Sequence, residues 1–457
     1  MIVKKFIFPA VTLLAMVGLI VGGCAPKATP TPTPQPTIPP TATEAPPTAT
    51  PVPSTPTPIP TKPAPKAEKV TLVYMAPGDA ARAEIIQHDI ELFEKENPNI
   101  KIEAQIVPYQ EYNSKLMAAI SAGTPPDIAH FYPPHFPIMV AQGLIMPVDD
   151  WASQWEYKDD VFPVAWEFVT LDGHIYTLPD MIQIDWMYYR ADWFKEDGLE
   201  PPETWEEFVE LAKHFTGEGR WGFGFTGATG AAGKYSMAMI MGGGGKWVDE
   251  EGKAALNTPG GIKGFTEYIN LCRVHEVCPD SAPANGFKEN LALFAAGKIA
   301  MFFHNPGSLV QVRRAAGEEA VGVWPIITLK GPTSNFGVGG EVIFKGCKDP
   351  EAAWKFIAFR ASPEVQKYWY EKAGVLPTLK SLYNEPPLKD DPAISIVPTI
   401  VNSFVFPEVP LILANWLPVK TEPPSIVQKA LVGEISPEEA VNQINAIVEK
   451  VLAQAKE

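Results

Sequence analysis

The sequence predicts an α/β fold, and this prediction rests on the order of elements in the first folded segment. Residues 70–75 form a β-rich run, and alternating apolar residues over 100–106 predict a second strand. Between them, Ile86, Ile90 and Phe93 recur at helical spacing and predict a helix over about 81–96. A helix over 111–122 and a strand over 127–131 follow. This alternation is typical of a parallel sheet with helices on both faces.

The chain has 457 residues, which is too many for one ordinary core, so two domains or one bilobed unit are expected. No internal repeat is visible. Further helices are expected where apolar residues recur at helical spacing after a proline or a Thr-Trp step: 205–215, 259–272, 350–360, 363–372 and 437–454.

The charge balance is strongly acidic, with a formal net charge of −16. Nucleic-acid binding needs a basic face to neutralise phosphates, and binding to an anionic membrane surface needs basic residues as well. The composition therefore argues against both functions.

The first 24 residues have the pattern of a secretory signal. Lys4 and Lys5 precede an apolar stretch over 6–20, and the small residues Val21-Gly22-Gly23 lead into Cys24. The last four residues resemble a bacterial lipobox, which implies a signal peptide over 1–23 and a lipid on Cys24. An uncleaved N-terminal anchor is the alternative. Both interpretations place the rest of the chain outside the cytoplasm.

A proline-rich segment follows the cysteine, with sixteen prolines over residues 26–66, mostly alternating with threonine. Such a segment cannot form a helix or a central strand. We expect residues 24–67 to be the lipidated cysteine and an extended stalk, with a reach on the order of 100 Å at about 3.1 Å per residue.

Three further cysteines fit an oxidising compartment. Cys272 and Cys278 enclose a short segment, so a disulfide between them is plausible, which would leave Cys347 as a buried thiol. No second Cys/His pair stands at ligand spacing, so we expect no metal site and no cofactor.

The order of motifs after residue 69 resembles the family 1 extracellular solute-binding proteins of ABC importers, the group that includes maltodextrin-binding proteins. The resemblance runs through nearly all of 69–457. Its landmarks are short turn and strand-end motifs in the family's order: FEKENPNIKI (93–102), AGTPPDI (122–128), GLIMPVDD (143–150), DGHIYTLP (172–179), YYRADWF (188–194), PETWEEF (202–208), GKIAM (297–301), Gly339-Gly340 and DPEAAWKF (349–356).

The resemblance implies a two-lobed periplasmic-binding-protein type II fold with a hinge and an interlobe ligand cleft. On that template, lobe one comprises 69–178 plus 342–385, and lobe two comprises 184–338 plus 390–457. It also implies a monomer, anchored to the cell membrane, that captures a sugar or oligosaccharide and delivers it to permease subunits without catalysis.

The predicted crossing between the lobes supplies the first candidate ligand-binding residues. Gln183 stands four residues after Pro179, where some maltodextrin binders have a carboxylate, and Asp185 and Trp186 follow it. Carboxylates and amides hydrogen-bond sugar hydroxyls, and aromatic rings stack on the apolar face of a pyranose. The alternative is that Asp185 binds backbone amides and Trp186 packs at the hinge.

The remaining candidates follow strands or glycines. Two of these candidates have a structural alternative: Asp79 could cap a helix, and Tyr132 could be a packed surface aromatic. Trp247 follows a glycine run that does not match a phosphate loop. Gly307 stands where relatives carry a stacking Trp, and hydrogen bonds from nearby polar residues would replace that contact here. The full set is Asp79, Tyr132, Trp247, His304, Asn305, Glu341 and Trp416.

Other ligands and other functions compete with sugar capture. A passive surface or adhesion protein would explain the stalk but not the ordered importer motifs. Polyamines would suit the acids Asp185 and Glu341, whereas glycerol phosphate would need clustered basic side chains, which these candidates lack. A glycoside hydrolase would need two carboxylates at a catalytic separation, and no motif pairs two of them. No nucleophile signature occurs either, so we expect a binding protein rather than an enzyme.

Overall fold

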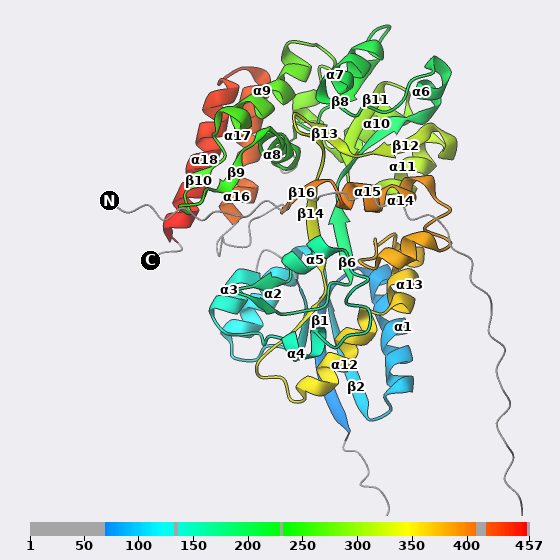
Figure 1. Ribbon diagram of the computed structural model, residues 1–457, viewed down its shortest axis with the longest axis vertical. Coiled ribbons are helices and arrows are strands. Elements are labelled where there is room, and N and C mark those ends of the chain that lie inside the picture. Colours follow the sequence, from blue (N-terminus) through cyan, green and yellow to red (C-terminus); the bar gives the residue numbers. More distant parts are fainter. Residues whose placement is uncertain (1–68, 132–135, 229–231, 408–416, 455–457) are drawn as a thin grey trace, which may run out of the picture. The chain divides into compact units, whose positions relative to one another are not determined.

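The protein is described by a computed structural model that covers residues 69–131, 136–228, 232–407 and 417–454 (Figure 1). These residues belong to one compact unit, Pro65–Glu457. The signal, Cys24, the stalk, Tyr132 and Trp416 lie outside the described residues, so the expectations for them remain predictions.

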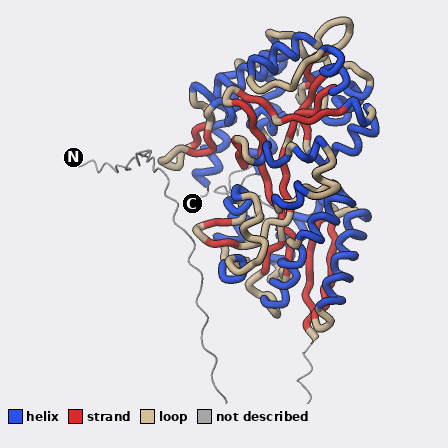
Figure 2. Tube along the Cα trace, turned by 45° about the vertical axis from the view of Figure 1, so that its right-hand side comes forward, coloured by secondary structure: helices blue, strands red, loops and turns tan. Residues whose placement is uncertain are grey.

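The first sheet has the strand order β15-β3-β1-β2. β1 pairs in parallel with both neighbours, and β15 is antiparallel to β3. Its strands are β1 (Val70–Pro77), β2 (Ile100–Val107), β3 (Ile128–His130) and β15 (Glu341–Ile343). Helices flank it (Figure 2): α1 (Ala80–Glu96), α2 (Tyr109–Ser121), α12 (Pro350–Arg360) and α13 (Pro363–Ala373).

The second sheet has the order β12-β7-β11-β8, in which β7 is antiparallel to both of its neighbours and β8 is parallel to β11. Its strands are β7 (Trp186–Arg190), β8 (Trp221–Gly224), β11 (Ile299–His304) and β12 (Val321–Trp324). The helices nearby are α6 (Ala191–Asp197), α7 (Trp205–His214), α10 (Phe287–Ala295) and α11 (Leu309–Ala316).

Two strands connect these sheets and pair with each other between them. β6 (Met181–Ile184) leads toward the second sheet, and β14 (Gly331–Gly339) leads back toward the first. They are antiparallel, with Gln183 opposite Gly337 and Met181 opposite Gly339. β14 also pairs with β13 (Ile326–Thr328) and with β16 (Phe404–Pro407). Figure 1 shows β6 and β14 side by side at this junction.

A group of helices packs beside the second sheet and carries part of the candidate site. Its members and the short strands next to them are α8 (Ala232–Gly243), α9 (Pro259–Arg273), α16 (Leu417–Thr421), α17 (Pro423–Val432), α18 (Pro437–Gln454), β9 (Lys246–Val248) and β10 (Ala254–Ala255). The remaining short elements include α3 (Phe136–Ala141), α4 (Asp149–Ala152), α5 (Pro163–Glu167), β4 (Thr170–Leu171), β5 (His174–Ile175), α14 (Pro392–Ser395) and α15 (Val397–Val401).

The alternation predicted from the sequence is confirmed. Strand, helix, strand, helix and strand occur as β1, α1, β2, α2 and β3, with ends within two residues of the predicted ones. The five later helices are confirmed as α7, α9, α12, α13 and α18. The residue limits of the two lobes remain a prediction, although two of the three crossings that they imply, at 178–184 and 338–342, coincide with β6 and with the end of β14. The third, near 385–389, lies between the short helical turn at Lys380–Asn384 and α14.

Close backbone approach explains Gly340, the residue between β14 and β15. A Cβ on Gly340 would lie 2.4 Å from the Leu178 carbonyl oxygen and 2.7 Å from Thr177 Oγ1. The Thr177 hydroxyl donates a 2.6 Å hydrogen bond to the Glu341 carbonyl, which holds the two crossing segments together. The sequence needs glycine here because a side chain would push these segments apart.

Gly340→Ala is therefore expected to destabilise the fold by about 1–3 kcal/mol, because backbone atoms must shift to admit the methyl group. Thermal unfolding checks this, with Gly346→Ala as the control, since nothing lies within 4 Å of a Cβ at Gly346. Equal melting temperatures for the two variants would contradict the packing argument.

Candidate ligand-binding site

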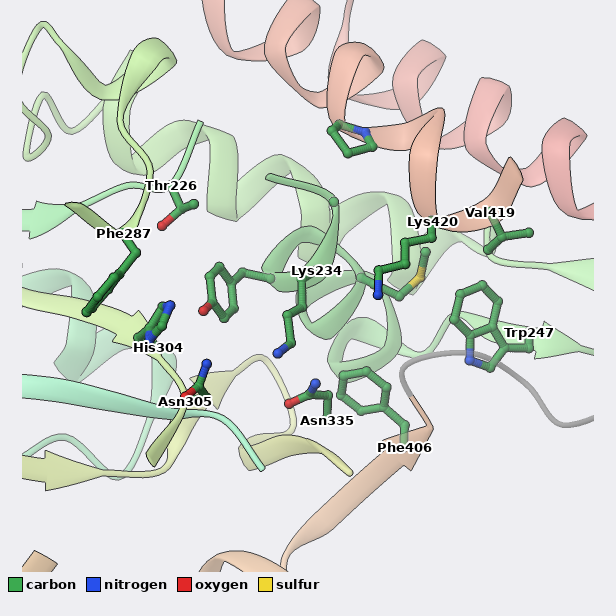
Figure 3. A pocket seen from close by; sticks show the side chains of 14 residues that line it. Thr226, Lys234, Trp247, Phe287, His304, Asn305, Asn335, Phe406, Val419 and Lys420 are labelled. Carbon is green, nitrogen blue, oxygen red and sulfur yellow. The ribbon is translucent and has the colours of Figure 1, made fainter. Parts of the chain in front are cut away.

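A cavity of about 250 Å³ lies where α8, β11, β14 and β16 meet, and we call it the aromatic cavity (Figure 3). In the view of Figure 3, Trp247 and Phe406 stand at one end and Phe287 with His304 at the other, with Lys234 and Asn335 between them. The described lining comprises Thr226, Gly233, Lys234, Tyr235, Met237, Trp247, Phe287, His304, Asn305, Asn335, Phe406, Val419, Lys420 and Pro424.

A second cavity of about 280 Å³ lies against the paired strands β6 and β14, and we call it the crossing cavity. Lys234, Asn305 and Asn335 line both cavities. The rest of its described lining comprises Arg82, Met181, Ile182, Gln183, Ile184, Pro306, Gly307, Gly337, Ala373, Gly374, Val375 and Leu376. The two cavities therefore adjoin through three polar side chains.

Lys234, on α8, is held by a carboxylate that belongs to the crossing. Its Nζ lies 3.0 Å from Asp185 Oδ1 and 2.9 Å from Oδ2. Asp185 joins β6 to β7 and is 1% exposed, and its N–H donates to Ser334 Oγ at 2.9 Å. Because a buried carboxylate needs a charged partner, this ion pair fixes the position of the ammonium group at the edge of both cavities.

His304, the last residue of β11, presents a neutral ring to the aromatic cavity. The ring stacks on Phe287 with centroids 3.9 Å apart, and Nδ1 lies 2.9 Å from Ser308 Oγ. Burial, with help from the Lys234 charge, lowers the pKa of His304 to about 4. At neutral pH the ring therefore offers a hydrogen bond without a charge.

Asn335, on β14, brings a buried polar atom to the site that lacks a hydrogen-bond partner among the described residues. It is 6% exposed, and its Oδ1 is buried without a hydrogen-bond partner in the part of the chain that the structure describes. Leaving such an oxygen without a donor costs about 1–3 kcal/mol. A ligand hydroxyl would remove that cost.

Four candidates from the sequence line the cavities: Gln183, Trp247, His304 and Asn305. Trp247 is nearly buried, and its indole N–H donates to the Pro407 carbonyl at 3.2 Å. Asp185 lies outside the lining and acts through Lys234. The structure thus brings half of the ten candidates to the site or next to it.

Three other candidates lie outside both cavities. For Asp79 and Trp186 the structure agrees with the alternative roles given above, which are helix capping and packing at the hinge. Asp79 caps α1 and accepts a hydrogen bond from the Arg82 amide at 2.9 Å. Trp186 is 0% exposed and packs edge-on against Tyr188. Glu341 is buried among charged residues of the first sheet, because its partners are on α12 and β3 rather than in a cavity.

Sequence reasoning missed several lining residues, chiefly Lys234, Asn335, Phe287 and Phe406. For Asn335 a signal was present. Thr333, Ser334 and Asn335 are three consecutive polar residues in a strand, and all three are buried. Such a run is typical of a strand whose polar groups have specific partners. The candidates from the sequence are all acidic or neutral, whereas lysines line these cavities and no carboxylate does among the described residues.

A family model described as bacterial extracellular solute-binding protein matches residues 90–396, which is more than half of the chain. The chain belongs to this family. The predicted resemblance is therefore confirmed at this level, and the protein is a solute-binding component of the kind that serves ABC importers. The members similar to it are binding proteins rather than enzymes, and membership implies a place outside the cytoplasm.

Two curated relatives each align with more than half of this chain. The maltotriose-binding protein of Pyrococcus abyssi is 26% identical over 329 residues, which is 70% of this chain and 69% of that protein. The mannitol-binding protein of Pseudomonas aeruginosa is 25% identical over 243 residues, which is 52% of this chain and 54% of that protein.

Solved structures confirm the predicted two-lobed α/β fold. An ABC transporter solute-binding protein from Thermotoga lettingae, bound with alpha-D-tagatose, is 26% identical, with a TM-score of 0.67 over 84% of this chain and 100% of that one. The sugar-binding protein MalE from Xanthomonas citri is 21% identical, with a TM-score of 0.76 over 85% and 98% of the two chains, and it supports the fold alone.

The cysteines of this solute-binding protein follow the predicted arrangement. Cys272, on α9, forms a disulfide with Cys278, with their Cα atoms 4.9 Å apart. Cys347 is a half-buried thiol, and burial raises its pKa to about 11. Among the helices that the structure describes, none combines the length and apolar character needed to cross a bilayer.

A buried charged cluster fixes the end of both crossing strands in the first sheet. The Arg360 guanidinium contacts Asp89 on α1, Glu341 at 3.2 Å and Asp180 at 3.5 Å. Trp369 lies under the guanidinium at 4.5 Å, and Tyr74 donates to Glu341 at 2.9 Å. Asp180 immediately precedes β6, and Glu341 begins β15 directly after β14, so one side chain ties both crossings to the helices.

The pKa values of the two crossing carboxyls shift in opposite directions, and both groups lie beside the same cation, Arg360. Burial and then the Glu341 charge raise the pKa of Asp180 well above its usual value. Burial opposes the ionisation of Glu341 too, but the Arg360 charge and hydrogen bonds from His130 and Tyr74 outweigh it and lower its pKa. Asp180 therefore keeps its proton to a higher pH than Glu341 does.

Asp180→Asn should remove a pH-dependent loss of stability. The folded protein keeps a proton on Asp180 that the unfolded chain releases above about pH 4, so stability falls as pH rises from there to the folded pKa. Asparagine cannot ionise, so the stability of the variant relative to the natural protein should increase over the same window. Urea unfolding across pH measures this, and a constant difference from about pH 4 to about pH 9 would contradict it.

Proposed function

We propose that this protein captures a sugar or polyol in the two adjoining cavities and delivers it to the permease of an ABC importer. The observation that carries the proposal is the mixed lining of the aromatic cavity. The aromatic rings of Trp247 and Phe406 face a group of uncharged hydrogen-bonding side chains that includes Asn305, Asn335 and His304. Ring faces suit the apolar side of a sugar, and amides suit its hydroxyls.

The names of the relatives support the same ligand class. Maltotriose and mannitol occur in the names of two curated relatives, and tagatose is bound to a structural neighbour. These ligands are uncharged polyhydroxylated molecules. A neutral His304 and a Lys234 already paired with Asp185 fit such a ligand.

The rest of the chain has a role in the same proposal. A lipid on Cys24 would anchor the protein at the outer face of the cell membrane, and the stalk would let a monomeric binding domain move above it. Lobes with the predicted limits, 69–178 plus 342–385 and 184–338 plus 390–457, would close around the ligand and present it to the permease subunits.

A phosphorylated polyol is the second candidate ligand. Lys234 and Lys420 line the aromatic cavity, and sn-glycerol-3-phosphate-binding proteins from Brucella abortus are 25% identical to this chain over 324 residues. A polyamine ligand is disfavoured, because the two acids that would bind it already have cationic partners. Asp185 pairs with Lys234, and Glu341 pairs with Arg360.

The proposal is tested by calorimetry and thermal unfolding of residues 67–457 with sugars, polyols, sn-glycerol 3-phosphate and polyamines. A ligand at 100 times its Kd should stabilise the fold by about 2.7 kcal/mol. Binding of a neutral sugar or polyol supports the proposal. If only glycerol phosphate binds, the ligand class is the second candidate, a phosphorylated polyol. If none of these compounds binds, both candidate ligand classes are contradicted.

Trp247→Leu should weaken binding of the identified ligand about threefold to tenfold, because the ring face is lost. Trp324→Leu is the matched control. Trp324 also donates its indole N–H to a proline carbonyl, that of Pro202 at 2.7 Å, but it lies outside both cavities. Calorimetry measures both variants, and an equal loss of affinity in each would argue against a contact with Trp247.

The affinity for a neutral ligand should be flat from about pH 6 to about pH 8 and fall as the pH approaches 4. His304 remains uncharged above its lowered pKa of about 4, and protonation would then bring a second cation beside Lys234. Titrations at several pH values check this. A steep change near pH 6.5 that His304→Gln abolishes would show that the ring titrates normally.

A further inference from the structure

Lys234 presents its charge to both cavities. It lines the aromatic cavity and the crossing cavity, whereas Lys420 lines the first alone and Arg82 the second alone. Its side chain is 28% exposed, and Figure 3 shows its amino group between His304 and Asn335. The charge acts on its surroundings, since burial and then the Lys234 charge lower the pKa of His304. A solute in either cavity would therefore meet this ammonium group.

The carboxylate that balances this charge lies outside the cavities. Asp185 is 1% exposed and lines neither of them. Both of its carboxylate oxygens nevertheless contact Lys234 Nζ, at 3.0 and 2.9 Å. Because two opposite charges this close offset each other at larger distances, the pair has a weaker field than the ammonium group alone. The pair therefore offers hydrogen-bond donors to a solute with little net charge.

One hydroxyl group holds Asp185 in this position. Ser334 Oγ, on β14, accepts a hydrogen bond from the Asp185 N–H at 2.9 Å and donates one to the Asp185 carbonyl at 2.8 Å. The residue that joins β6 to β7 is therefore fixed against a neighbouring strand, with its carboxylate beside α8. Separating a buried carboxylate from its cation is costly, so the pair should persist when a solute enters.

We propose that Asp185 is a specificity-determining residue, which makes the site favour neutral solutes over anionic ones by balancing the charge of Lys234 from outside the cavities. It acts through Lys234 and touches no solute itself. This inference rests on the proposed function, and it names the residue that decides between the two candidate ligand classes. Without the carboxylate, the same ammonium group would attract a carboxylate or phosphate of the solute.

The first test compares the natural protein with Asp185→Asn, which keeps the shape of the side chain and removes its charge. Calorimetry of residues 67–457 measures the affinity for four pairs of neutral and anionic solutes: glucose and glucuronate, galactose and galacturonate, mannitol and mannitol 1-phosphate, and glycerol and sn-glycerol 3-phosphate. In each pair that binds, the ratio of anionic to neutral affinity should rise at least tenfold in the variant.

A smaller rise in this ratio overturns the inference. So does a natural protein that binds the anionic member of a pair more tightly than the neutral one, and that result leaves the transport role standing with an anionic ligand. Binding of no member of any pair to the natural protein counts against the proposed function itself, and the inference is then decided by a measurement that needs no sugar or polyol.

That measurement is thermal unfolding in inorganic phosphate and in chloride at equal ionic strength. Phosphate should raise the melting temperature of Asp185→Asn by about 2 °C or more above that of the natural protein, because the unbalanced ammonium group binds an anion. Asp391→Asn is the matched control. Asp391 also pairs through both oxygens, with Arg313 at 2.6 Å, but lies outside both linings, so this variant should respond as the natural protein does. Equal responses of all three proteins overturn the inference.

A double variant separates a role in specificity from a role in folding. Asp185→Asn combined with Lys234→Gln removes both charges, so the ratio of anionic to neutral affinity and the response to phosphate should return to within about threefold of the natural values. A double variant that behaves like Asp185→Asn alone overturns the action through Lys234. Thermal unfolding shows whether each variant folds, and Asp185→Ser takes the place of Asp185→Asn in every comparison if the asparagine variant does not.

Discussion

The arrangement of the site depends on how one buried guanidinium holds the two crossing strands. Arg360 contacts carboxylates from α1, from the residue before β6 and from the first residue of β15. A buried arginine is tolerated only with such partners, and removing either side leaves an uncompensated charge. Because β6 begins and β14 ends beside this cluster, the pairing of the two strands is fixed at the end where Met181 lines the crossing cavity.

Lys234 provides the corresponding constraint at the other end of the crossing. Its ion pair with Asp185 links α8 to the turn between β6 and β7. The ammonium group is therefore positioned by the crossing rather than by its own helix alone. The chain is strongly acidic as a whole, yet its cavities are lined by lysines and amides among the described residues. The global charge thus describes the surface and says little about the site.

The fold could be predicted from the sequence to a large extent because its signals are local. Alternation and helical spacing located β1 to β3 and the long helices, and short motifs identified the family. Part of the site could be predicted too, since Gln183, Trp247, His304 and Asn305 all follow a strand, a glycine run or the predicted hinge.

The rest of the site depends on partners far away in the sequence. Asp185 and Glu341 are both acids near a crossing, but Lys234 lies 49 residues from the first and Arg360 lies 19 from the second, and those partners decide which one is near a cavity. Likewise, local sequence does not distinguish a tryptophan that lines a cavity, such as Trp247, from one that packs only in the core, such as Trp186. Burial of the ring is decided by strands that come from elsewhere in the chain.

The pairing of Gln183 with Gly337 has a consequence for how binding energy is used. Both residues line the crossing cavity, and both belong to the two-stranded ribbon that connects the sheets. In the proposed function, a solute in that cavity would lie against the backbone that twists if the sheets reorient, and not only against the surfaces on either side. Its fit would then resist or favour twisting of the ribbon directly, so that shape selection and mechanical coupling would reside in the same few residues.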